Sequence, residues 1–262
     1  MKNNQKAVSA RRQQILQMVL DAGEITVTDI AQAHNISDMT VRRDLQYLED
    51  QNLIWRTHGG ANSIDKAREL KRYGEEIVHC RDSISKYAAR FVNDDDTLFI
   101  NGSRTALNLL KHLGDKKVLV YTNNGWSVGE RYPEGVTICL TGGELRNRVM
   151  VGEYVMRHLL SITVDKIFIG CAGVYDDGEF RYDIPTEIGI NESLISRTGN
   201  KLYVLADHSK LLRRSGHSNF YGSSTYDRQI TLITDERADV ATLNRLRDRG
   251  LEIITVPVNP DK

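Results

Sequence analysis

The sequence contains no long apolar run. No stretch approaches the roughly 18 consecutive apolar residues that a membrane-spanning helix needs. The N-terminal residues 1–14 are polar, and no apolar stretch follows their charges as it would in a secretory signal. We therefore expect a protein that is neither secreted nor membrane-spanning and that works in the cytoplasm.

The chain also lacks an excess of either charge, and it has few cysteines. Its 262 residues carry 35 Lys+Arg and 35 Asp+Glu, which disfavours a protein that coats nucleic acid indiscriminately. Cys80, Cys139 and Cys171 are odd in number and far apart, and two of them lie in apolar runs that read as strands. We expect three buried thiols in a reducing cytosol.

Several motifs of cofactor-dependent chemistry are absent. The sequence has no Cys/His cluster with zinc spacing, no Walker phosphate loop and no Gly-x-Gly-x-x-Gly fingerprint. We therefore expect no resident metal, no cofactor and no nucleotide hydrolysis.

The period of the apolar residues changes along the chain. Apolar positions follow helical spacing three times in the first 50 residues. Gly23 can end the first helix, Thr26 or Thr28 can cap the second and Ser37 can cap the third. Residues 53–60 then read as a small hairpin. Alternating charge over residues 63–80 indicates a linker that can be partly helical.

Beyond residue 80, short β-rich runs alternate with amphipathic helical patterns. This alternation predicts a mostly parallel sheet covered on both faces, so the fold class is α/β. We divide the chain into a small, mainly helical domain (1–62), a linker (63–80) and a larger α/β domain (81–262). The expected strands are Thr97–Ile100, Val118–Tyr121, Val136–Leu140, Lys166–Cys171, Lys201–Leu205, Gln229–Ile233 and Leu251–Val256.

Three short helices followed by a hairpin are the layout of a winged helix-turn-helix, whose third helix enters a DNA major groove. The charged side of that helix could instead be only a solvated face. The placement of this helix after a tight turn and before the hairpin favours contacts with DNA. The domain's seven basic and seven acidic residues leave it neutral, so each domain should bind DNA weakly. We therefore expect a dimer or tetramer that binds repeated half-sites. The expected DNA contacts are Ser37, Asp38, Met39, Thr40, Arg42, Arg43, Arg56 and His58.

These residues resemble a known family. The run Ser37-Asp38-Met39-Thr40-Val41-Arg42-Arg43-Asp44-Leu45, followed by Arg56-Thr57-His58-Gly59-Gly60-Ala61, strongly resembles the DeoR family of bacterial transcriptional regulators. The resemblance implies an operator-binding regulator, most often a repressor. It also implies a sensor domain with a fold similar to sugar-phosphate isomerases and deaminases, which binds a phosphorylated sugar. We interpret Asp44 as a carboxylate that orients a neighbouring arginine.

Five segments after expected strands carry small or polar residues. Ligands bind in open α/β sheets just beyond the carboxyl ends of the strands, so we expect a pocket there. Each segment alone could be only a turn, and His208 could be a loop histidine without a ligand role. The expected ligand contacts are Asn101, Gly102, Ser103, Arg104, Thr105, Thr122, Asn123, Gly142, Gly143, Glu187, Asp207 and Lys210.

The sequence departs from the family in the first of these segments and again at residue 191. Asn101 stands where the family has an acid, Ser103 where it has a glycine and Arg104 where it has a hydroxyl residue, and Asn191 replaces a lysine. Arg104 could bind the effector, extend into solvent or pair with Asp94 or Asp96. These changes alter the expected pocket charge, so the effector could differ from a common hexose or pentose phosphate.

Two other classes of function remain open. The large domain could catalyse aldose–ketose isomerisation or deamination, for which Asp207 or Glu187 could serve formally as the acid or base. The chain could also be a scaffold that dimerises through its large domain. A linked DNA-reading domain gives ligand binding a purpose without chemistry, and we therefore expect a regulator of a carbohydrate-catabolism operon and not an enzyme.

Overall fold

Capping residues set the ends of the first helices. The structure is a computed structural model that describes residues 2–51, 53–175, 177–197, 201–212, 217–220 and 229–258. Helix α1 (Lys2–Ala22) ends before Gly23, whose φ is 72°. Thr26 caps α2 (Val27–His34) by accepting from the Asp29 N–H, and Ser37 caps α3 (Asp38–Asp50) by accepting from the Thr40 N–H. The predicted boundaries at Gly23, Thr26 and Ser37 are confirmed.

The first three helices share one apolar core. Ile15 and Val19 on α1, Ile30 on α2, and Val41 and Leu45 on α3 are all buried in the same cluster. Asn35 ends α2 in the left-handed conformation, with a φ of 51°, which turns the chain sharply before α3. The predicted helix-turn-helix is therefore present.

A three-stranded sheet follows the helix-turn-helix. Strands β2 (Ile54–Arg56) and β3 (Gly60–Ser63) form the predicted hairpin, and β1 (Glu24–Thr26) pairs antiparallel with β3. The sequence analysis missed β1, which is only three residues long. Position 60 requires glycine because a Cβ there would lie 2.1 Å from the Ile25 carbonyl oxygen.

The segment 63–80 that we predicted as a linker is largely helical. Helix α4 (Ile64–Tyr73) and the start of α5 (Glu75–Ala88) occupy it, and Gly74 separates them with a φ of 81°. The chain forms two compact units, Met1–Val78 and His79–Lys262, whose boundary falls within this segment.

The second unit is built on a seven-stranded sheet of order β15-β14-β12-β9-β4-β5-β6. All neighbouring strands are parallel, as predicted. The strands are β4 (Thr97–Ile100), β5 (Val118–Thr122), β6 (Val136–Leu140), β9 (Lys166–Gly170), β12 (Lys201–Leu205), β14 (Ile230–Asp235) and β15 (Glu252–Val256).

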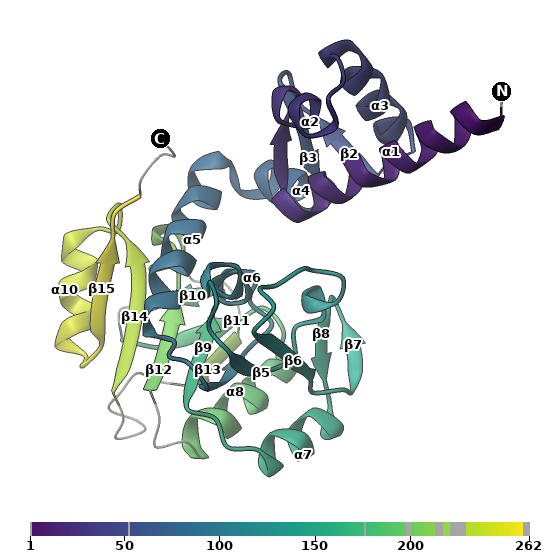
Figure 1. Cartoon of the computed structure of the whole chain (residues 1–262). Coiled ribbons are helices and arrows are strands. Elements are labelled where there is room, and N and C mark those ends of the chain that lie inside the picture. The colour runs from purple at the N-terminus through teal and green to yellow at the C-terminus, as the bar shows by residue number, and fades with distance from the viewer. Residues whose placement is uncertain are drawn as a thin grey trace. The chain divides into compact units, whose positions relative to one another are not determined.

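Two apolar clusters cover the two faces of this sheet. Leu98 and Ile100 of β4 lie in one cluster and Phe99 lies in the other, because successive side chains of a strand point to opposite faces. Helices α5 and α6 (Arg104–Asn108) contribute to the first cluster, whereas α7 (Glu153–Ser161) and α8 (Thr186–Arg197) cover the other face (Figure 1). The prediction of a doubly covered α/β sheet is confirmed.

Smaller elements complete the second unit. The sequence analysis did not predict the short hairpins, because strands of two to four residues leave no clear period. They are β7 (Glu144–Arg146), β8 (Val149–Val151), β10 (Gly173–Val174), β11 (Phe180–Tyr182) and β13 (His217–Phe220). Among the described residues, the remaining helices are α10 (Val240–Asp248) and the 3₁₀ turns η1 (Ala89–Phe91), η2 (Leu109–His112), η3 (Gly125–Ser127) and η4 (His208–Lys210).

The three cysteines are free thiols, and Cys80 and Cys171 are buried. Cys139 is only half-buried, so the expectation of three buried thiols is wrong at this position. Its strand, β6, is at the end of the sheet and has a neighbour on one side only.

None of the helices in the described ranges combines the length and apolar character of a membrane span.

Candidate functional sites

The start of α3 presents polar and charged side chains outward. Arg42 and Arg43 are exposed, and Met39 is 61% exposed. Asp38 and Ser37 are also exposed, whereas Thr40 is half-buried. Val41, Leu45 and Leu48 on the opposite side are buried. The helix therefore has one face for the core and one face that is free to contact a partner.

Asp44 ties α3 to α1. Its carboxylate is 1% exposed and accepts hydrogen bonds from the Nε atoms of Arg11 at 2.7 Å and Arg12 at 2.8 Å. The guanidinium of Arg12 also lies 3.8 Å from the ring centroid of Tyr47. The interpretation of Asp44 as an arginine-orienting carboxylate is confirmed, although its partners come from α1, which the sequence spacing did not indicate.

The hairpin is attached to the same helix. The Arg56 backbone N–H donates to Glu49 Oε1 at 3.0 Å, and its guanidinium donates to Gln46 Oε1. Arg56 is half-buried and His58 is exposed at the turn. These bonds fix the hairpin relative to α3, so the two elements can contact DNA as one surface.

In the second unit, Asn101 joins the ends of β4 and β9. Its amide Nδ2 donates to the Gly170 carbonyl at 3.0 Å, and its Oδ1 accepts from the N–H groups of Gly170 at 3.0 Å and Ser103 at 3.2 Å. The side chain is 2% exposed. An amide can donate and accept in this way, whereas a carboxylate could not donate to the Gly170 carbonyl. Asn101 therefore holds the strand ends in place.

The Thr-Asn-Asn segment after β5 has a similar role. Thr122 Oγ1 donates to the Ile100 carbonyl at 2.6 Å, and Asn123 Nδ2 donates to the Met150 carbonyl at 3.1 Å. Asn124, which we did not predict, donates through Nδ2 to the carbonyls of Asn101 at 3.2 Å and Ser103 at 3.0 Å. Several of the residues that we predicted as ligand contacts therefore use their side chains to hydrogen-bond the main chain and connect strand ends.

Ser103 and Thr105 belong to the short helix after β4. Ser103 Oγ accepts from the Ala106 N–H at 3.3 Å, and the Thr105 carbonyl accepts from Ser85 Oγ at 2.8 Å. Gly142 and Gly143 lie in the exposed turn between β6 and β7, with φ values of 75° and 100°. A Cβ at Gly143 would lie 2.6 Å from the Val151 carbonyl oxygen. Both glycines therefore supply the positive φ values that this turn requires.

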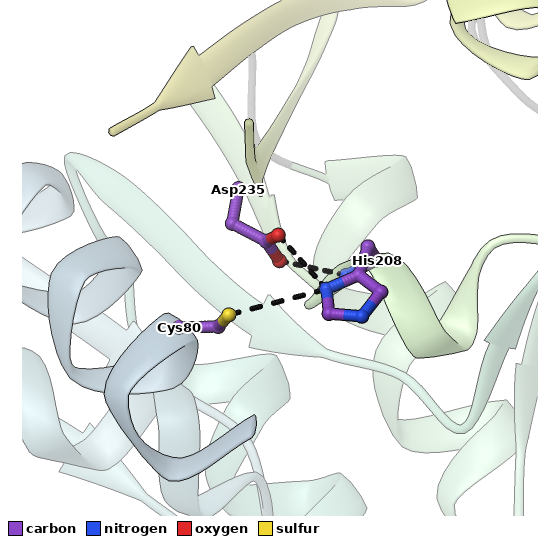
Figure 2. Close-up of side chains that lie close together, drawn as sticks. All are labelled: Cys80, His208 and Asp235. Atoms are coloured by element: carbon purple, nitrogen blue, oxygen red, sulfur yellow. Dashed lines mark hydrogen bonds and ion pairs between the residues drawn. The ribbon is translucent and has the colours of Figure 1, made fainter. Parts of the chain in front are cut away.

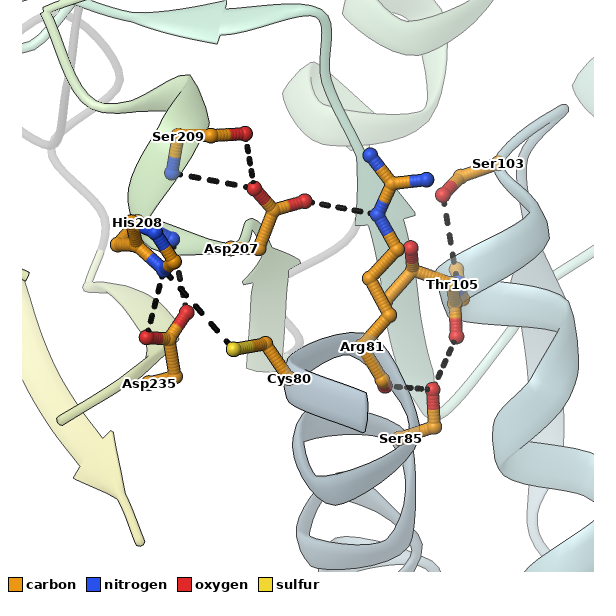
Figure 3. Close-up of polar contacts among 10 residues, drawn as sticks. Cys80, Arg81, Ser85, Ser103, Thr105, Asp207, His208, Ser209 and Asp235 are labelled. Carbon is orange, nitrogen blue, oxygen red and sulfur yellow. Dashed lines mark hydrogen bonds and ion pairs between the residues drawn. The ribbon is translucent and has the colours of Figure 1, made fainter. Parts of the chain in front are cut away.

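A buried ion pair lies at the end of β12 (Figure 3). Arg81 Nε of α5 donates to Asp207 Oδ2 at 2.8 Å, and Ser209 N donates to Asp207 Oδ1 at 3.1 Å. Burial alone would raise the pKa of Asp207, but the charges of Lys210 and Arg81 and the Ser209 bond hold it below its ordinary value. Arg81 escaped prediction because it follows the charged segment that we read as a linker.

Lys210 brings a second positive charge to this position. Burial lowers the pKa of its ammonium group, although nearby Cys171 and Asp207 raise it. Within the described ranges, no hydrogen bond or ion pair involves this ammonium group. The Lys210 residue is half-buried, and a partly desolvated cation without a direct partner favours an incoming anion.

Buried polar atoms without partners gather on α8. Glu187 Oε1 and both side-chain polar atoms of Asn191 are buried and have no hydrogen-bond partner among the described residues. A Cβ at Gly102 would lie 2.5 Å from Glu187 Oε1, so the glycine makes room for this carboxyl. Burial and the charge of Asp183 raise the Glu187 pKa to about 7. Such atoms call for polar ligand groups or water.

Arg104 stacks on an aromatic ring. The guanidinium carbons of Arg104 and Arg148 each lie 4.4 Å from the ring centroid of Trp126. Asp96 instead pairs with Lys166, and Asp94 accepts from the Lys117 N–H at 2.7 Å. Arg148 is exposed and was not predicted, because its place in the β7–β8 hairpin left no sequence signal.

One serine-hydrolase pattern, which the sequence analysis overlooked, is present but is not a nucleophile site. Residues 125–129 read Gly-x-Ser-x-Gly, a motif that acts when its serine sits on a strand-to-helix turn. Ser127 lies in the short η3 turn, is 7% exposed and donates its hydroxyl to the Asn124 carbonyl at 2.7 Å. Its hydroxyl is therefore part of a turn.

Comparisons with known proteins identify the family. The DeoR-like helix-turn-helix domain matches residues 11–67, and the DeoR C terminal sensor domain matches residues 78–236. The chain belongs to the DeoR family. It is thus a DNA-binding transcriptional regulator with a sensor domain, as the sequence resemblance implied.

Full-length relatives agree with this assignment. The DeoR-family chain is 27% identical over 258 residues to the uncharacterized HTH-type transcriptional regulator YulB of Bacillus subtilis (strain 168), covering 96% of this chain and 98% of that protein. It is 29% identical to the HTH-type transcriptional repressor GlcR of the same organism, covering 95% and 96%. The HTH-type transcriptional regulator GolR of Listeria innocua is 27% identical, covering 93% and 96%.

A solved structure of ribose 5 phosphate isomerase A from Neisseria gonorrhoeae matches with a TM-score of 0.35 and 16% identity, covering 52% of this chain and 54% of that one.

Proposed function

We propose that the chain is a cytoplasmic repressor of a carbohydrate-catabolism operon that binds a phosphorylated sugar at the carboxyl edge of its large sheet. The first unit supplies the contacts to double-stranded operator DNA through Ser37–Thr40, Arg42, Arg43, Arg56 and His58. A neutral domain with few basic contacts binds weakly alone, so the active form is a dimer or tetramer on repeated half-sites.

The observation that carries the effector proposal is the charge arrangement around Asp207. Arg81 neutralises this carboxylate at 2.8 Å, and the half-buried Lys210 adds a positive charge with no direct partner among the described residues. A phosphate group supplies the missing negative charge. In this proposal Lys210 contacts the phosphate. Arg104, whose guanidinium stacks on the Trp126 ring, contributes a further positive charge.

The sugar part of the effector is matched by the polar atoms on α8. Glu187 and Asn191 present buried oxygen and nitrogen atoms without hydrogen-bond partners in the described structure. Hydroxyl groups can donate to the Glu187 carboxylate and exchange hydrogen bonds with the Asn191 amide. The effector switches the regulator only if it binds one arrangement of the chain more tightly than another.

One observation favours a second candidate function, aldose–ketose isomerisation. A buried carboxyl such as Glu187, with a pKa of about 7, has the acidity of a general base that works at neutral pH. Interconversion of a bound aldose phosphate and ketose phosphate by the purified chain would establish this activity. In the proposal we favour, the sugar phosphate binds without turnover, and Glu187 accepts a hydroxyl hydrogen bond.

Thermal unfolding with a panel of sugars tests the effector proposal. Phosphorylated sugars, the matching unphosphorylated sugars and inorganic phosphate are added separately to the full chain. A sugar phosphate at 100 times its dissociation constant adds about 2.7 kcal/mol to the free energy of unfolding. Lys210→Met removes this response, and Lys201→Met, which changes an exposed lysine on β12, keeps it. Stabilisation by neutral sugars alone would contradict the phosphate site.

A further inference from the structure

Three potential metal ligands meet beside the Arg81–Asp207 pair. Cys80 comes from α5, His208 begins η4 and Asp235 ends β14, so three distant segments supply one side chain each (Figure 2). One donor atom from each residue lies within 4.8 Å of the other two. This convergence could not be recognised from spacing in the sequence, because 128 positions separate Cys80 from His208.

The three side chains are already oriented toward a common point. Cys80 Sγ lies 3.9 Å from His208 Nδ1, and the same Nδ1 lies 2.8 Å from Asp235 Oδ1. Cys80 and Asp235 are fully buried, whereas the His208 side chain is 24% exposed. The cluster therefore has two enclosed ligands and one ligand that is reached from solvent.

The geometry does not fit a Cys–His–Asp catalytic triad. A triad passes a proton through the two different nitrogens of the imidazole ring. Here the thiol and the carboxylate both face Nδ1, so one nitrogen would have to serve both partners. Burial and the nearby Asp235 charge also raise the pKa of Cys80 to about 12, which leaves the thiol unreactive on its own.

We propose that Cys80, His208 and Asp235 bind one divalent ion of the zinc class. Zinc accepts thiolate, imidazole and carboxylate ligands together, whereas calcium and magnesium require oxygen ligands. The ion takes the place of the Cys80 thiol proton, which leaves to solvent, and His208 binds through a deprotonated Nδ1. Water fills the fourth position on the exposed side of His208.

Neighbouring groups hold the carboxylate in place for this role. Asp235 Oδ2 accepts from the His208 N–H at 2.8 Å, and Oδ1 accepts from the Arg237 N–H at 3.1 Å. Such outer bonds orient a ligand and reduce the rearrangement that metal binding requires. Cys80 precedes Arg81 and His208 follows Asp207, so the ion links α5 to the strand ends next to the ion pair (Figure 3).

Cobalt absorption tests the site directly. Co²⁺ is added to the full chain after removal of metal with a chelator. We expect one ion per chain, with visible bands of a low-symmetry cobalt site and a near-ultraviolet thiolate-to-cobalt band. Cys80→Ser loses the thiolate band, whereas the matched control Cys139→Ser, which changes the half-buried thiol of β6, keeps it.

A second variant and a second measurement keep the test independent of folding. His208→Gln weakens cobalt binding by more than about tenfold, and Zn²⁺ raises the melting temperature of the wild type and of Cys139→Ser but not of His208→Gln. Circular dichroism checks that each variant is folded. A wild-type chain without the thiolate band, or a Cys80→Ser spectrum equal to that of wild type, overturns the proposal.

Discussion

Arg81 and Asp207 are 126 positions apart in the sequence, and their side chains form a hydrogen-bonded ion pair of 2.8 Å. The side chains are 8% and 0% exposed. Desolvating two charges is costly, and the ion pair and the Ser209 hydrogen bond to Asp207 offset this cost. The pair fixes α5 against the carboxyl edge of the sheet, where we place the effector.

Removing one member of this pair should destabilise the second unit strongly. Arg81→Met leaves the buried Asp207 carboxylate without its ion-pair partner, and we expect a loss of roughly 3–5 kcal/mol in the free energy of unfolding. Urea denaturation measures this loss. Lys86→Met, which changes an exposed residue of the same helix, should cost less than about 1 kcal/mol. Equal losses in the two variants would show that the ion pair contributes little.

Asp44 should matter for the stability of the first unit. Asp44→Asn removes the charge that holds Arg11 and Arg12, and we expect a loss of about 1–3 kcal/mol because the hydrogen bonds to charged groups weaken. Thermal unfolding followed by Trp55 fluorescence in a Trp126→Phe background measures it, because Trp126 in the second unit would otherwise add to the signal. Asp50→Asn, at an exposed position of α3, is the control. An unchanged Asp44→Asn transition would refute the anchoring role.

Two exposed arginines should determine operator affinity. Arg42→Ala and Arg43→Ala should each weaken binding to the promoter region, while the second unit stays folded. Loss of a bidentate guanine contact costs about 1–3 kcal/mol and relaxes one base position, whereas loss of a phosphate contact weakens binding to all sequences alike. Gel-shift titrations at fixed salt distinguish these results. The α3 assignment fails if neither variant changes the affinity for any promoter fragment.

Stability should depend on pH through Glu187. Burial raises its pKa from 4.5 to about 7, so the folded chain keeps a proton that the unfolded chain releases between these values. The free energy of unfolding therefore falls as pH rises through this window, by an amount on the order of 3 kcal/mol. Glu187→Gln should flatten the decline, and Glu192→Gln on the same helix should not. Denaturation curves across the window provide the measurement, and parallel wild-type and Glu187→Gln profiles would contradict this account.

The regular elements followed from local patterns. Strand β9 (Lys166–Gly170) is buried along its whole length, and after Lys166 it appears in the sequence as a continuous apolar run. Caps such as Ser37 depend on the residues next to them and were also predictable. Strand β1 was not, because three residues on a sheet edge carry too short a pattern.

The sites depend on contacts that local patterns do not encode. Asn101 stands where the family has an acid, and we interpreted it as a change in the charge of the pocket. Its amide instead joins the ends of β4 and β9 by hydrogen bonds to the Gly170 main chain. Arg81 follows the charged segment that we read as a linker and carried no signal of its own, although its partner Asp207 lies at a distant strand end. The position of a polar segment after a strand was predictable, whereas the partner of each side chain depends on the folded sheet.

The most direct test of the regulatory account combines DNA binding with effector binding. Fluorescence anisotropy follows the full chain on a labelled fragment of its own promoter region while sugars are added. We expect one or more phosphorylated sugars to change the apparent dissociation constant for DNA tenfold or more, equivalent to about 1.4 kcal/mol. The unphosphorylated sugars should have no such effect, and Lys210→Met should bind the DNA without responding. Operator affinity that is the same with and without every phosphorylated sugar, or that changes equally with the neutral sugars, would contradict the account.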